Sequence, residues 1–124
     1  MSSGRSISLF LLVALLVTLA YVARPAATSE ELDLEALAGC IGDSGAVFYG
    51  AWWCPFCKRQ KQEFASHAWL LPYVECYAEG TRELLPVCED EEIKSFPTWV
   101  FPDGSSQSGL ITPGRLARLT DCQQ

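Results

Sequence analysis

Residues 46–57 read AVFYGAWWCPFC, and this stretch decides the fold. Its first five residues are apolar, aromatic or small and carry no charge, which is typical of a buried strand in a parallel sheet. The stretch ends in Cys54 and Cys57, which are separated by a proline and a phenylalanine. Residues 55–68 then show the apolar spacing of an amphipathic helix, and a proline suits its first turn. The sequence therefore predicts a strand that leads directly into a helix, with two thiols at the junction.

Cys54 and Cys57 are predicted to be a redox-active pair. Their spacing lets two thiols share one disulfide across a single helical turn. Cys54 is expected at the helix N-terminus, where unpaired backbone N–H groups and the helix dipole favour an anion. Thiol–disulfide exchange needs a thiolate, so Cys54 is the expected attacking thiol and Cys57 the resolving one. The redox-active disulfide then serves in place of a cofactor, and no metal is expected at the site.

Further elements follow from hydrophobic periodicity and from turn residues. The chain from residue 46 is predicted to run strand, helix, strand, helix, strand, strand, helix, which is an α/β order. The remaining expected elements are a helix over 30–39 with capping-box residues Thr28 and Glu31, strands over 73–77, 98–101 and 106–111, a helical stretch over 82–92 broken by Pro86, and a helix over 113–121.

A second motif, Ser95-Phe96-Pro97-Thr98, stands just before the strand expected at 98–101. If the bond before Pro97 is cis, the backbone there presents free hydrogen-bonding groups to a substrate chain. A plain loop proline is the alternative. The dithiol that precedes the motif in the chain favours the first interpretation, a cis-proline that faces a substrate.

Together these stretches resemble the thioredoxin family. WCPFC follows the strand AVFYG, and FPT precedes TWVF. The closer resemblance is to the thioredoxin-like domain attached to bacterial and plant vitamin K epoxide reductase homologues, carried by FYGAWWCPFCKRQKQEF, LPYVEC and VCEDEEIKSFPTW over residues 46–101. The resemblance implies a thioredoxin-like fold, a βαβαββα core with an extra N-terminal helix, over residues 30–124.

The resemblance also implies roles for individual residues. Cys54 and Cys57 would be the catalytic pair and Pro97 the cis-proline. Cys76 and Cys88 would be an additional pair, either a structural disulfide or a relay for electrons; a zinc site built from all four cysteines is a further alternative. The residues expected to contact a substrate are Trp53, Pro55, Phe56, Phe96 and Pro97. The pairing of Cys40 and Cys122 stays open.

The function implied is that of a thiol–disulfide oxidoreductase outside the cytoplasm. It would oxidise cysteines of exported proteins and pass the electrons to a separate quinone-coupled membrane partner, similar to vitamin K epoxide reductase. One alternative is a membrane-tethered disulfide reductase or isomerase. Another is a non-enzymatic structural or zinc-binding module.

One position departs from the family pattern. Thioredoxins and protein disulfide isomerases commonly carry a buried acid six residues before the first active cysteine, and here that position is Phe48. Glu75, on the neighbouring predicted strand, is the candidate substitute. Without the buried base, the site favours accepting electrons over fast reduction.

The N-terminal segment contains 17 uncharged residues, 7–23, after a short polar stretch. We expect residues 1–23 to be a signal-anchor or transmembrane segment, residues 24–29 a linker and the rest the folded domain. A cleaved signal peptide is the alternative. The basic residues place the domain in the periplasm or, equivalently, in the thylakoid lumen of a photosynthetic cell.

Composition restricts the remaining possibilities. The 124 residues make up one domain, and a net charge of −6 makes the chain a poor binder of nucleic acid, because such binding relies on Lys and Arg. Six cysteines behind an export segment point to an oxidising compartment.

Overall fold

The computed structural model describes residues 3–22 and 31–123. The chain divides into two compact units, residues 1–31 and residues 32–124. The linker expected at 24–29 and the capping residue Thr28 lie outside the described residues.

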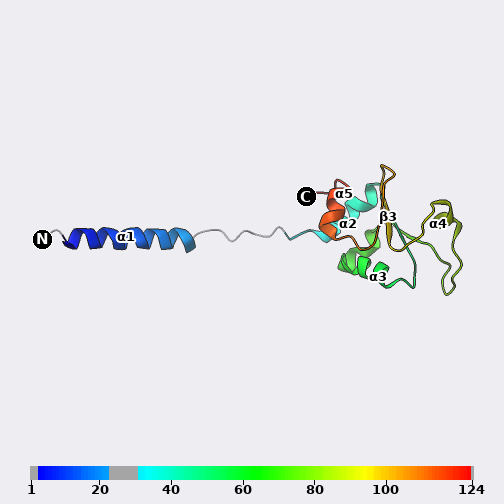
Figure 1. Ribbon diagram of the computed structural model, residues 1–124, viewed down its shortest axis with the longest axis horizontal. Coiled ribbons are helices and arrows are strands. Elements are labelled where there is room, and N and C mark those ends of the chain that lie inside the picture. Colours follow the sequence, from blue (N-terminus) through cyan, green and yellow to red (C-terminus); the bar gives the residue numbers. More distant parts are fainter. Residues whose placement is uncertain (1–2, 23–30, 124) are drawn as a thin grey trace. The chain divides into compact units, whose positions relative to one another are not determined.

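The first unit contains a single helix, α1, which spans Ser3–Val22 (Figure 1). Its large apolar side chains are exposed, from Ile7 to Val22. Within the residues that the structure describes, no helix has the length and apolar character needed to cross a membrane.

The second unit is a mixed α/β structure built on four strands in the order β2-β1-β3-β4. Strand β1 pairs parallel with β2 and antiparallel with β3, and β3 pairs antiparallel with β4. This architecture is compatible with the expected thioredoxin-like fold. The strands are β1 (Val47–Gly50), β2 (Tyr73–Glu75), β3 (Thr98–Val100) and β4 (Ser106–Ser108).

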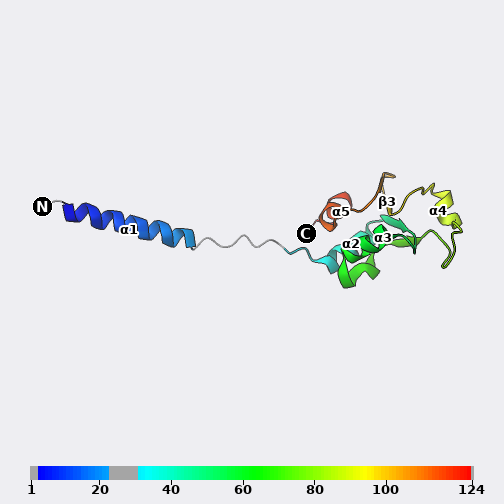
Figure 2. The same ribbon diagram turned by 60° about the horizontal axis from the view of Figure 1, so that its bottom comes forward.

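Four α-helices and one 3₁₀-helix accompany the sheet. In both views, α4 lies at the opposite end of this unit from α5 (Figures 1 and 2). The helices are α2 (Leu34–Asp43), α3 (Pro55–Gln62), the 3₁₀-helix η1 (Ala65–Leu70), α4 (Pro86–Asp90) and α5 (Pro113–Leu119).

Most elements differ in their bounds from the predicted ranges: β2, β3 and α5 are shorter at their C-terminal ends, and α4 covers only the middle of the stretch expected over 82–92. Three of the differences have clear local reasons. Helix α2 begins at Leu34 because the side chain of Asp33 accepts the free N–H groups of its first turn. Helix α3 ends at Gln62 because Ala65 adopts a φ of 48°, which a continuing α-helix cannot contain. Strand β4 ends at Ser108 because Gly109 turns the chain with a φ of 94°.

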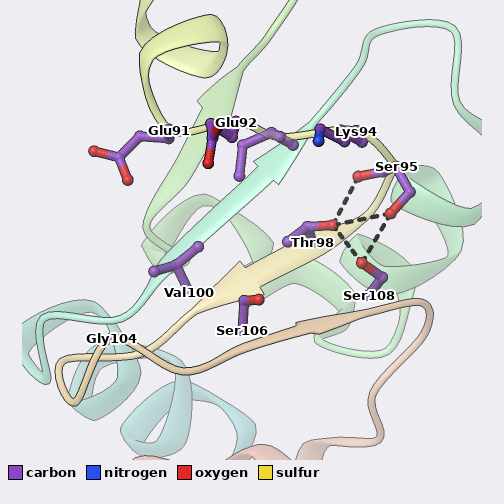
Figure 3. Close-up of a pocket in the computed structure, with 10 residues that line it drawn as sticks. Glu91, Glu92, Lys94, Ser95, Thr98, Val100, Gly104, Ser106 and Ser108 are labelled. Atoms are coloured by element: carbon purple, nitrogen blue, oxygen red, sulfur yellow. Dashed lines mark hydrogen bonds between the residues drawn. The ribbon is translucent and has the colours of Figure 1, made fainter.

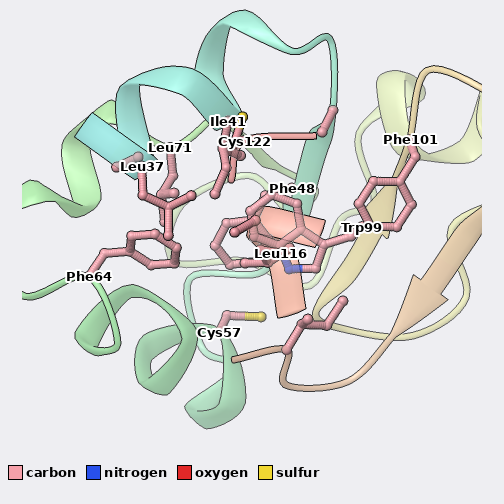
Figure 4. Packing of buried hydrophobic residues seen from close by; sticks show 14 of the residues in the cluster. Leu37, Ile41, Phe48, Cys57, Phe64, Leu71, Trp99, Phe101, Leu116 and Cys122 are labelled. Atoms are coloured by element: carbon pink, nitrogen blue, oxygen red, sulfur yellow. The ribbon is translucent and has the colours of Figure 1, made fainter. Parts of the chain in front are cut away.

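The sheet buries apolar residues on both faces. On one face, the rings of Phe48 and Trp99 stack 4.8 Å apart. Leu37, Phe64 and Leu116 belong to the same buried cluster, which Figure 4 shows from close by. The smaller cluster contains Tyr49, which follows Phe48 in β1, together with Cys76, Cys88 and Ile93. The side chains of successive residues of β1 thus point to opposite faces of the sheet, as is usual for a β-strand.

The topology brings the two sequence motifs to one edge of the sheet. Strand β1 leads toward Cys54, and β3 begins directly after Pro97. Because β1 and β3 run antiparallel, with Tyr49 opposite Thr98, the end of one strand lies beside the start of the other.

Candidate functional site

Cys54 and Cys57 lie together at the start of α3. Cys54 is the N-cap residue, and its Sγ accepts a hydrogen bond from the backbone N–H of Cys57 at 3.1 Å. Backbone N–H groups at a helix N-terminus stabilise negative charge. Here the atom that accepts a hydrogen bond from such an N–H group is Cys54 Sγ. These are the two free cysteines of the chain, and their side chains are 3% and 2% exposed.

Cys57 is held in its protonated form by its surroundings. Burial raises the pKa of the Cys57 thiol to about 12, and the hydrogen bond to the Cys54 side chain adds to that effect. Among the groups that act on it, Lys61 lowers the pKa. A thiol of high pKa is a poor leaving group and a poor nucleophile unless its anion is stabilised.

The Pro97 loop packs against the dithiol loop through aromatic rings. The Phe96–Pro97 peptide bond is cis, and Pro97 is fully buried. The ring of Phe96 meets the ring of Trp53 edge-on, with centroids 6.2 Å apart. Since Trp53 precedes Cys54 directly, this contact joins the two loops that the sequence motifs identify.

Two residues that sequence reasoning missed complete this aromatic cluster. Tyr77 lies 5.5 Å from Trp53 and 5.7 Å from Phe96, measured between ring centroids. The guanidinium of Arg82 lies over the Trp53 ring at 4.1 Å. Both residues belong to the loop between Cys76 and Cys88, and a disulfide between these cysteines is the one signal that could have pointed to them.

Other expected substrate contacts lie at the surface. Pro55 is exposed, and the side chain of Phe56 is 52% exposed. Trp52, which was not among the predicted residues, is 40% exposed, and its indole N–H donates to the Thr81 carbonyl at 3.3 Å. Apolar surface next to Cys54 suits a partner that presents an apolar segment.

The other four cysteines form two disulfides. Cys76 pairs with Cys88, and both are fully buried. Cys40 pairs with Cys122, which settles the pairing that the sequence left open. Cys76 and Cys88 therefore offer no thiolates in this structure, and the four-cysteine zinc site is not formed. Over residues 3–22 and 31–123, no cluster of His, Cys, Asp or Glu has the arrangement of a metal site.

Glu75 occupies a polar niche beside the dithiol loop, whereas Phe48 is completely buried. One carboxylate oxygen, Oε1, accepts the backbone N–H groups of Trp52 and Tyr77 at 3.0 and 3.1 Å. The other, Oε2, accepts the hydroxyl of Tyr73 at 2.7 Å. Burial and this hydrogen bond raise the pKa of Tyr73, so its phenol stays protonated.

A cavity of about 270 Å³ lies elsewhere on the molecule, between the segment 91–95 that follows α4 and the β3–β4 pair (Figure 3). Hydroxyl groups at one end form a hydrogen-bonded network, in which Ser108 Oγ lies 2.8 Å from both Ser95 Oγ and Thr98 Oγ1. No cysteine lines the cavity, so it is separate from the dithiol.

The chain is similar to a protein whose name states thiol–disulfide chemistry. No family model matches the chain. Over 108 residues, or 84% of its length, the chain is 36% identical to a protein from Arabidopsis thaliana named thiol-disulfide oxidoreductase LTO1. The aligned part makes up 28% of that relative's own length.

Proposed function

We propose that this chain is an enzyme, a thiol–disulfide oxidoreductase of thioredoxin-like fold, with Cys54 and Cys57 as its redox pair. The observation that carries the proposal is the contact between Cys54 Sγ and the N–H of Cys57 at the first turn of α3. The name of the Arabidopsis relative supports the same chemistry. So does the packing of Trp53 against Phe96, which brings the Pro97 loop to the dithiol loop.

The chemistry proceeds by disulfide exchange. In the oxidised enzyme, a substrate thiolate attacks Cys54 Sγ, forms a mixed disulfide and releases Cys57 as a thiolate. A second substrate thiol then displaces Cys54, so that the substrate leaves with a disulfide and the enzyme holds two thiols. Two electrons have moved from the substrate to Cys54 and Cys57.

The enzyme works, in this proposal, as an oxidase outside the cytoplasm, in the periplasm or thylakoid lumen. Its substrates are cysteines of exported proteins. The disulfides Cys40–Cys122 and Cys76–Cys88 support an oxidising compartment, because structural disulfides are rare in the cytosol. A separate quinone-coupled membrane protein, similar to vitamin K epoxide reductase, reoxidises the pair; the resemblance of FYGAWWCPFCKRQKQEF and VCEDEEIKSFPTW supports that partner.

The second candidate is a reductase or isomerase that uses the same cysteines in the opposite direction. The raised pKa of Cys57 favours it, because burial destabilises the Cys57 thiolate, and a reduced pair without thiolate stabilisation has a lower reduction potential. The reduction potential of the Cys54–Cys57 pair separates the two functions. A potential of about −120 to −200 mV supports the oxidase, and one near about −270 mV supports the reductase.

Trapping with Cys57→Ala tests the proposal directly. This variant keeps Cys54 but cannot resolve a mixed disulfide, so it should accumulate covalent adducts with its substrates and with its electron acceptor. The matched control is Cys54→Ala, which keeps the buried Cys57 and should accumulate few. Equal adduct levels in the two variants would contradict the assignment of Cys54 as the attacking thiol.

A further inference from the structure

Lys61, Tyr73 and Glu75 form a connected set beside the dithiol, which we call the flanking triad. The Nζ atom of Lys61 lies 3.3 Å from the centroid of the Tyr73 ring. The Tyr73 hydroxyl donates to Glu75 Oε2 at 2.7 Å. Lys61 comes from α3, and the other two residues come from β2, so the triad depends on packing between distant parts of the chain.

Tyr73 of the triad and Cys57 both lie next to Gly50, the last residue of β1. A Cβ atom added to Gly50 would lie 3.2 Å from Cys57 Sγ, 3.1 Å from the Tyr73 hydroxyl oxygen and 2.5 Å from Tyr73 Cε2. The sulfur and the phenol therefore border the same point of the backbone, where only glycine leaves enough room. Lys61 also stands one helical turn after Cys57, on the same face of α3.

Lys61 and Cys57 each favour the charged form of the other. The pKa of Lys61 is lowered, because burial outweighs the negative charges of Glu75 and of a Cys57 thiolate, which both act to raise it and favour the charged ammonium. In return, Lys61 lowers the pKa of Cys57, against the effects of burial and of Cys54. A cation over an aromatic ring in a partly buried position is screened less by salt than an exposed one.

We propose that Lys61, held over the Tyr73 ring and kept charged by Glu75, is a positioning residue that stabilises the Cys57 thiolate during disulfide exchange. The inference rests on the proposed function. When a substrate thiolate attacks Cys54 Sγ, the Cys54–Cys57 bond breaks and its electron pair stays on Cys57 Sγ. In the reverse step, the Cys57 thiolate attacks Cys54 Sγ and expels the substrate thiolate. The first step is faster when the Cys57 anion is more stable, because a more stable thiolate is a better leaving group. The reverse step is also faster below the pKa of Cys57, because the gain in thiolate fraction outweighs the lower nucleophilicity of the more stable thiolate.

The experiment measures the reverse step in the full chain with Lys61→Met. Reduced protein is mixed with one equivalent of dithiobis(nitrobenzoate), an aromatic disulfide that releases a coloured thiolate. Attack by Cys54 releases the first coloured thiolate, and attack by Cys57 releases the second in a first-order phase. The matched control is Lys58→Met, which removes an exposed charge from the same helix.

Lys61→Met should slow the second phase between about pH 6 and pH 9, by about threefold for each unit by which the pKa of Cys57 rises. Each unit lowers the thiolate fraction tenfold, and the greater nucleophilicity of the remaining thiolate offsets about threefold of that loss. Lys58→Met should change it less than about twofold, as expected of a screened surface charge. Lys61→Arg should restore most of the rate, because a guanidinium keeps the charge and stacks on aromatic rings. The loss in Lys61→Met should persist in high salt.

Glu75→Gln supplies a second test that retains the oxygen for the Trp52 and Tyr77 N–H groups. Loss of the carboxylate should lower the pKa of Lys61 further, so that Lys61 loses its proton at a lower pH. The rate should match the wild type at about pH 6 and fall progressively below it toward about pH 9. Parallel pH profiles would overturn the role given to Glu75.

The outcomes separate the two proposals. Equal second-phase rates in Lys61→Met and Lys58→Met would overturn the role of Lys61 and leave the proposed function standing. A wild-type protein that releases only one coloured thiolate would overturn the proposed function itself, since Cys57 would then fail to resolve the mixed disulfide.

Discussion

Cys57 links the chemistry of the site to the stability of the molecule. Burial raises the pKa of its thiol from 9.0 to about 12, so the folded protein keeps this proton where the unfolded chain loses it. The stability due to this difference is fully present below about pH 9 and is lost as the pH rises toward about 12.

The reduced protein should therefore lose stability between about pH 9 and pH 10.5, by up to about 1.4 kcal/mol per pH unit from this group alone. The protein with a Cys54–Cys57 disulfide should lose less, because its Cys57 does not titrate. Urea unfolding of both forms across this range measures the difference, with Cys57→Ala as the control. Identical slopes for the reduced protein and Cys57→Ala would contradict the assignment.

Gly50 lies at a position beside the site where no larger residue fits. In Gly50→Ala the new Cβ would lie 2.5 Å from Tyr73 Cε2, so the Tyr73 ring has to move away from Cys57. Overpacking of this kind costs about 1–3 kcal/mol of folding stability. Gly39→Ala is the matched control, since a Cβ at that position meets nothing within 4 Å. Thermal unfolding should show a large drop for the first variant and none for the second.

At the scale of elements, Gln60 joins α3 to the segment before α5. Its side chain is fully buried, and its amide donates to the Ile111 carbonyl at 2.8 Å while its carbonyl accepts the Ile111 N–H at 2.9 Å. Both polar groups of Ile111 thus find partners although Ile111 lies outside the strand ladders.

Gln60→Leu should leave both Ile111 groups unpaired, at a cost of about 1–3 kcal/mol for each group. Gln62→Leu, at an exposed position of the same helix, should change stability by less than about 0.5 kcal/mol. Urea midpoints of the two variants against the wild type test this. A small effect of Gln60→Leu would mean that water reaches Ile111 in the variant.

The two disulfides act on the whole of the second unit in different ways. Cys40–Cys122 joins α2 to the end of the chain across 82 residues, whereas Cys76–Cys88 closes a loop of 12. Constraint of the unfolded chain grows with loop length, so the longer loop contributes roughly 1.7 kcal/mol more.

Replacing Cys40 and Cys122 together with alanine should therefore destabilise the protein by about 4.5 kcal/mol, and replacing Cys76 and Cys88 by about 3 kcal/mol. The second double variant should also change the tryptophan fluorescence of the native state, because its loop holds Tyr77 and Arg82 against Trp53. Chemical unfolding and native-state emission measure the two effects. An unchanged emission would show that the loop keeps its place without the disulfide.

Much of the fold was predictable because its signals are local. The uncharged strand before Cys54, the proline at the first turn of α3 and the turn after β3 each act within a few residues. Element ends were less predictable. The end of α3 depends on the φ angle of Ala65, and the start of α2 depends on capping by Asp33, and neither leaves a strong periodic signal.

The chain by itself determined that two thiols stand one helical turn apart at the end of a strand, because spacing and periodicity are properties of adjacent residues. It also placed a proline motif before the third strand. Only the tertiary structure decided which cysteines pair, that Tyr77 and Arg82 meet Trp53, and that Lys61, Tyr73 and Glu75 meet beside Cys57. These contacts join residues that are far apart along the chain, and they form only when the sheet and helices pack.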